Sequence, residues 1–109
     1  MSKVKTEILG PVISDFLKYE ATPQTRVAVA ADEGTKAGKF VEYPLRGKKL
    51  VALTDEADGK VVVQPLNCII DLSKVADADI KTATTGKTLD ALKKEGDAYG
   101  IVYQGTPAA

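Results

Sequence analysis

Short runs of alternating apolar residues, each closed by turn-forming residues, constrain this chain more than any other feature of its sequence. Neighbouring side chains of a strand point to opposite faces of a sheet, so such runs favour half-buried β-strands. Glycine, proline and Asp-Gly pairs between the runs favour turns, as at Asp58-Gly59. Strands are predicted at 26–30, 40–43, 48–54, 60–64, 67–72 and 99–103. The pattern is typical of a small, mainly β domain.

One segment near the C-terminal end has helical spacing. Leu89 and Leu92 lie three residues apart on one face of a helix, and either Thr85 or Thr88 is a candidate N-cap. Gly96 is the predicted stop, because glycine commonly ends helices. The connection at 76–86 is polar and is predicted to carry no helix. The expected fold class is therefore mainly β or α+β: one small domain of short strands with one helix in the C-terminal half.

The first 25 residues differ in character from the rest of the chain. Gly10-Pro11 interrupts an apolar stretch, Ser14 is placed to cap a short turn, and Pro23 prevents any helix from continuing. Several large apolar side chains lie here with no room for a core of their own. We therefore expect an extended N-terminal arm at 1–25, which either packs on the rest of the chain or meets a partner, followed by a β-rich domain at 26–109.

Composition excludes several classes of function. The chain has 109 residues, enough for one domain, and its 15 basic side chains balance its 15 acidic ones. It therefore lacks the strong basic field that nucleic-acid binding usually needs. Histidine, the commonest general base and metal ligand, is absent, and the lone Cys68 is expected to be a small buried apolar residue. Neither an export signal nor a membrane span is predicted, so synthesis in a reducing cytoplasm is the expectation.

Two motifs are too incomplete to indicate a binding site. Asp55, Glu56 and Asp58 resemble part of a cation-binding loop, but a solvated turn accounts for them better. Residues 86–88 match the end of a phosphate-binding loop, whereas that motif requires a glycine where this chain has Lys81. We predict no catalytic residue, no metal site and no cofactor.

The order of three segments along the chain resembles a known family. ISDFLKYE at 13–20 is followed by TRVAVA at 25–30 and Ala-Gly at 37–38, and LDALKKEG at 89–96 precedes Gly-Ile-Val at 100–102. In this order they resemble the lambda-like head decoration proteins of tailed bacteriophages. The match covers roughly half of the chain, and the middle, 39–80, matches only in its β character. The resemblance implies a small β-tulip-like barrel.

The resemblance also implies a structural, non-enzymatic role in the virion. Members of this family form homotrimers on local three-fold axes, on the outside of expanded heads built from an HK97-type major capsid protein. They stabilise the shell against internal DNA pressure, and their arm pairs with a strand of the capsid protein. Carried over by position, Phe16, Leu17 and Tyr19 become the anchors of the arm. Their predicted supports are Ile8, Val12 and Ile13.

Two other classes of function stay open. A different phage adaptor, such as a tail or head-completion component, is expected to form hexameric or dodecameric rings. A small enzyme or ligand-binding domain, which has to work without histidine, requires an apolar pocket with a convergent carboxylate. Oligomeric state and pocket chemistry therefore separate the three possibilities.

Overall fold

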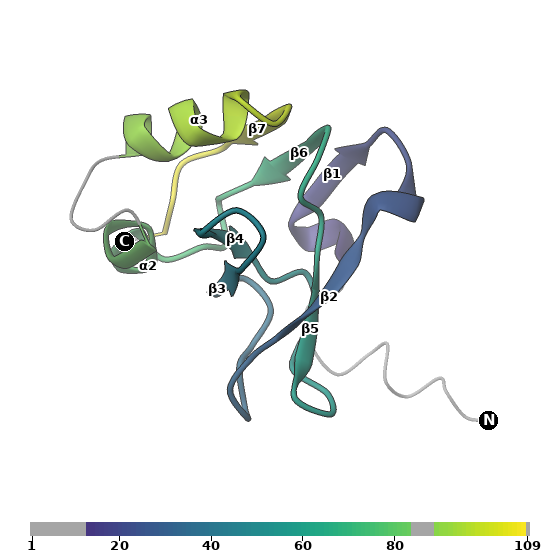
Figure 1. Cartoon of the computed structure of the whole chain (residues 1–109). Coiled ribbons are helices and arrows are strands. Elements are labelled where there is room, and N and C mark those ends of the chain that lie inside the picture. Colours follow the sequence, from purple (N-terminus) through teal and green to yellow (C-terminus); the bar gives the residue numbers. More distant parts are fainter. Residues whose placement is uncertain (1–12, 84–88, 109) are drawn as a thin grey trace.

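The computed structural model describes residues 13–83 and 89–108, which form seven short strands and two α-helices (Figure 1). Two 3-10 turns, η1 (Ile13–Asp15) and η2 (Pro23–Thr25), flank the first strand, and the helices are α2 (Asp77–Ala83) and α3 (Leu89–Asp97). The strands are β1 (Leu17–Glu20), β2 (Val27–Ala30), β3 (Phe40–Tyr43), β4 (Lys48–Val51), β5 (Lys60–Val63), β6 (Cys68–Asp71) and β7 (Ile101–Gln104).

The strands pair into three small sheets. One sheet has the order β1-β6-β7, β2 pairs with β5, and β3 pairs with β4; every pair is antiparallel except β6 with β7. The six predicted strands correspond to β2–β7 and are confirmed, as is the mainly β, α+β fold class. Over residues 13–83 and 89–108 the sheets do not close into the expected β-tulip-like barrel, because β2 and β3 lie against each other without a hydrogen-bonded ladder.

One hydrophobic core joins the sheets and helices. Its pattern follows the alternation of strands: β7 buries Ile101 and Tyr103 and exposes Val102 and Gln104. Burial raises the pKa of Tyr103, since the phenolate form is disfavoured away from water. The largest fully buried side chains include Phe16, Leu53, Leu72, Ile80, Leu92 and Ile101.

Helix α3 packs against β7 through a glycine. A Cβ at Gly96 would lie 2.5 Å from the carbonyl oxygen of Ile101 and 2.8 Å from the ring of Tyr103. Only glycine therefore allows the helix this close to the strand. The prediction that Gly96 stops the helix is wrong, since α3 continues to Asp97. The predicted helix is confirmed, and Leu92 on its apolar face is buried. The helix thus lies over the main-chain groups of β7.

The connection that we predicted to be non-helical contains a second helix, α2. Asp77 and Asp79 lie in its first turn and Lys81 in its last, which suits the helix dipole, and Lys81 Nζ lies 3.3 Å from Asp77 Oδ2. Ile80 is its only buried residue. A helix with one apolar anchor gives no recognisable period in the sequence. In the part of the chain described, no helix is long and apolar enough to cross a membrane.

The acidic side chains of the loop before β5 stabilise turns by accepting backbone hydrogen bonds. Glu56 accepts hydrogen bonds from the backbone N–H groups of Gly34 (3.1 Å) and Gly59 (2.6 Å), which hold its pKa below the ordinary value. Asp55 accepts one from the backbone of Ala37 at 2.9 Å. Asp58 and Gly59 have positive φ, 55° and 79°, as the predicted turn requires. Among the described residues no group of three or more acidic or cysteine side chains is placed to hold a metal ion.

Candidate functional site

Part of the predicted N-terminal arm is a strand of the folded domain. β1 pairs antiparallel with β6, and Phe16 and Leu17 are 2% and 8% exposed in the core. A Cβ on Gly38 would lie 2.9 Å from the Phe16 ring, so this glycine leaves space for it. The predicted boundary at residue 25 therefore does not match the structure, in which the domain already includes residues 13–25. Gly10-Pro11 and Pro23 made this segment look separate, although its strand partner lies 50 residues further on.

The free edge of β1 forms a groove of about 400 Å³. Three of the six predicted contact residues line it: Ile13, Leu17 and Tyr19. Phe16 points into the core instead, and Ile8 and Val12 lie outside the described residues. The groove is lined by Ile13, Ser14, Leu17, Lys18, Tyr19, Glu20 and Arg26. The groove thus combines the apolar residues Ile13 and Leu17 with a charged wall, Glu20 and Arg26, beside a tyrosine that is 58% exposed.

The main-chain groups at this edge are set by the register of β1 on β6. Asp71 N donates to Phe16 O at 2.7 Å, and Ala21 N donates to Asn67 O at 2.9 Å. Because hydrogen-bonded and non-bonded residues alternate in an antiparallel pair, the N–H and C=O groups of Leu17 and Glu20 point away from β6. Within the described residues these groups have no strand beside them. They are donors and acceptors that an added strand can use.

A bulge in β1 separates the two faces of this edge. The register shifts between Leu17 and Tyr19, so Lys18 is the extra residue. As a result Leu17 points inward and Tyr19 outward, although they are two residues apart. Lys18 Nζ donates to the carbonyl oxygen of Ser14 at 2.7 Å. A short strand with a bulge and a lysine discourages unspecific pairing, so this edge is available but selective.

A polar network fixes the charged wall of the groove. Arg26 forms a two-pronged ion pair with Glu20, with Nε 3.0 Å from Oε2 and Nη2 bonded to Oε1. Gln64, which is buried, donates to Glu20 Oε2 at 2.7 Å and accepts from Thr25 Oγ1 at 2.6 Å. The hydrogen bond from Arg26 is the main reason why the pKa of Glu20 is lowered and that of Arg26 raised. Glu20 is therefore ionised at neutral pH.

The only thiol is unsuited to covalent chemistry. Cys68 is buried on the inner face of β6, as predicted, and its Sγ lies 3.7 Å from the carbonyl oxygen of Gln64. Burial, with a smaller contribution from Glu20, raises its pKa to about 11. The thiol is thus protonated and shielded at neutral pH, which makes it a weak nucleophile.

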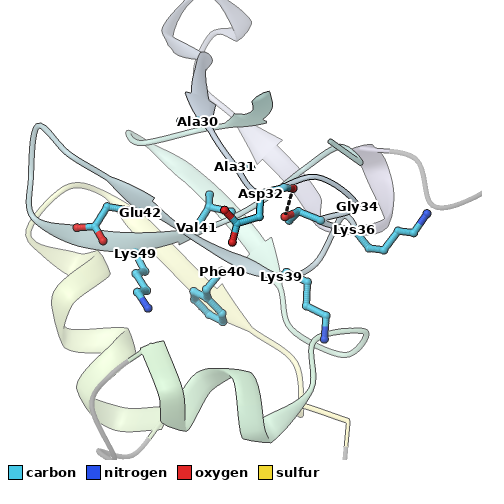
Figure 2. Close-up of a pocket in the computed structure, with 11 residues that line it drawn as sticks. Ala30, Ala31, Asp32, Gly34, Lys36, Lys39, Phe40, Val41, Glu42 and Lys49 are labelled. Carbon is cyan, nitrogen blue, oxygen red and sulfur yellow. Dashed lines mark hydrogen bonds between the residues drawn. The ribbon is translucent and has the colours of Figure 1, made fainter. Parts of the chain in front are cut away.

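A second concavity, of about 410 Å³, lies between the end of β2 and β3. Figure 2 shows Asp32, Glu42, Lys36, Lys39 and Lys49 around it, with charged ends that are spread out rather than directed to one point. Lys39 is also paired with Asp79 of α2 at 3.0 Å. An apolar pocket with a few convergent polar groups is the usual form of a small-molecule site, and this concavity does not have that form.

The predicted contact residues Ile13, Leu17 and Tyr19 line the groove, whereas the polar residues of the groove were not predicted. Glu20, Arg26 and Gln64 meet only because β1, η2 and the end of β5 converge, and no spacing in the sequence indicates this. In comparisons with known proteins, no protein-family model, no curated protein and no solved structure matches this chain. The site is therefore interpreted from its own geometry.

Proposed function

We propose that this protein decorates the head of a tailed bacteriophage, binding as trimers to the outside of the expanded shell and stabilising it against internal DNA pressure. The observation that carries the proposal is the free edge of β1, with its groove, in the segment that resembles the family's capsid-binding arm. In this proposal the major capsid protein, of the HK97 type, supplies a strand that pairs with β1. Phe16 has the different role of fixing β1 to the domain.

Contacts between the matched segments support the proposal. Gly38, in the second segment, leaves space for Phe16 in the first. Gly96 and Ile101, both in the third, touch through the helix and strand that contain them. Two pairs of residues from the matched segments, Phe16 with Gly38 and Gly96 with Ile101, are therefore neighbours in the fold.

The strength of one docking edge favours a multivalent complex. Leu17 and Glu20 offer up to four main-chain hydrogen bonds. At a net ~0.5–1.5 kcal/mol each, these contribute about 2–6 kcal/mol. Ordering an added strand opposes this by ~1–2 kcal/mol per residue. One copy therefore binds weakly, whereas three copies in a trimer bind by avidity, because the second and third contacts are intramolecular.

The test is attachment to expanded, DNA-free heads assembled from the major capsid protein of the same genome. We expect the full chain to saturate the heads in multiples of three copies and to raise their temperature of disruption. Tyr19→Ser should weaken attachment, and Leu45→Ser is the matched control, because Leu45 is 87% exposed on the β3–β4 turn, outside the β1 groove. Removal of residues 2–12 tests the rest of the predicted arm without deleting β1.

Two results would contradict the proposal. A folded protein that does not bind expanded heads at micromolar concentration excludes a decoration role. Hexameric or dodecameric rings in native mass spectrometry, with no binding to the shell, indicate a tail or head-completion adaptor instead.

A further inference from the structure

The outer face of the β1-β6-β7 sheet carries an apolar row across all three strands. Tyr19 lies opposite Ile69 on β6, and Ile69 lies opposite Val102 on β7. Tyr19 and Val102 are 58% and 44% exposed, and Ile69 is half-buried. The sheet is mixed, since β6 and β7 are parallel, and this face is not covered by another element among the described residues at Tyr19 and Val102. Exposed apolar side chains that adjoin one another across all three strands mark a candidate contact surface.

Polar residues border this row along the strands. Asp71 and Gln104, which are partners in the register of β6 and β7, lie two residues beyond Ile69 and Val102 on the same face. Asn67, which is exposed, lies two residues before Ile69. An apolar centre inside a polar rim is the usual composition of a protein–protein interface. Tyr19 belongs both to this row and to the groove at the β1 edge, so the two surfaces are continuous.

We propose that the partner that adds a strand to β1 also covers this row as far as β7, so that docking uses the edge and the outer face together. The inference rests on the proposed function and deepens it, because it specifies the partner's chemistry. The added strand carries an apolar side chain beside Tyr19, and an adjoining apolar surface of the same capsid protein covers Ile69 and Val102. Few main-chain bonds are available at a four-residue edge, so the face supplies the missing apolar contact.

A substitution at Val102 distinguishes this proposal from simple strand addition at β1. Val102 lies two strands from the free edge, roughly 10 Å away at the usual strand spacing, and does not line the groove. A partner that only extends the sheet at β1 does not reach it. Val102→Thr keeps the shape and the β-branched side chain but places a hydroxyl where the interface is apolar.

The experiment titrates expanded heads with wild-type protein, Val102→Thr, Tyr19→Ser and the control Leu45→Thr, and measures bound copies by co-sedimentation. We expect half-saturation to need about tenfold more Val102→Thr protein, which corresponds to ~1.4 kcal/mol, with Leu45→Thr unchanged. Val102→Asp should abolish binding while circular dichroism remains native, because an unpaired charge is then buried in the interface.

Each of the following results would contradict a different part of the proposal. If Tyr19→Ser weakens attachment and Val102→Thr does not, strand addition stands and coverage of the outer face is wrong. If Val102→Thr changes the oligomeric state of the free protein, the row belongs to contacts between copies and the inference is wrong. If folded wild-type protein does not bind the heads, the proposed function fails, and this inference fails with it.

Discussion

Replacing Phe16 by alanine tests whether the segment before η2 is part of the core. The side chain is 2% exposed and fits against Gly38, where even a methyl group would lie 2.9 Å from its ring. Removing a buried phenylalanine typically costs about 3–5 kcal/mol. Against a total stability of ~5–15 kcal/mol this is a large fraction. At roughly 4–8 °C per kcal/mol, we expect the melting temperature to fall by about 12–40 °C.

The matched control is Tyr19→Ala, because Tyr19 is an aromatic residue three positions away but 58% exposed. It should change stability by no more than about 0.5–1 kcal/mol. Urea unfolding followed by circular dichroism gives both free energies of unfolding, and Phe16→Leu, which keeps most of the volume, provides a milder loss if the alanine variant does not fold. Equal and small losses for Phe16→Ala and Tyr19→Ala would refute the placement of Phe16 in the core and restore the free arm.

Three further predictions concern the polar network, the helix and the thiol. The ion pair lowers the pKa of Glu20 in the folded protein, so it stabilises the fold at pH values above the unfolded pKa, near 4.5, and this stabilisation is lost as the pH falls through the folded pKa. In urea unfolding, Glu20→Gln should therefore lower the free energy of unfolding by about 1 kcal/mol at pH 7 and by less at pH 3. An equal loss at both pH values would contradict the ion pair with Arg26. Gly96→Ala should destabilise the folded protein by about 1–3 kcal/mol in thermal melts, although alanine has the better helix propensity, because its methyl group would collide with the carbonyl oxygen of Ile101. A more stable variant would contradict that contact. Cys68, with a pKa of about 11, should resist a thiol reagent at pH 8 in the folded protein and react fully in denaturant. Rapid labelling of the native protein would contradict the burial of Cys68 in the core.

The strands were predictable because their alternation survives in the sequence, and β1 was not because of its bulge. In β5, β6 and β7 buried residues alternate with more exposed ones, as Ile101 and Tyr103 do with Val102 and Gln104. In β1 the bulge at Lys18 places Leu17 and Tyr19 on opposite faces, which removes that signal. Local pattern therefore gives the type of most elements but does not identify a strand whose alternation is interrupted by a bulge.

The candidate site was predictable only in its apolar part. Ile13, Leu17 and Tyr19 stand out as apolar residues near a chain end, and the structure places all three in the groove. The ion pair of Glu20 with Arg26 depends on how η2 turns the chain, and its contact with Gln64 spans 44 residues. Burial of Phe16 likewise depends on a distant glycine. These are tertiary contacts, and no local spacing specifies them.

The free edge of β1 as the docking site is tested most directly by a cryo-electron microscopy map of expanded heads saturated with this protein. We predict density for three copies at each local three-fold position, with a strand of the shell running alongside Leu17–Glu20 and shell density over the apolar row that ends at Val102. Copies attached through another surface, such as the turn at Leu45, with β1 facing solvent, would contradict the account.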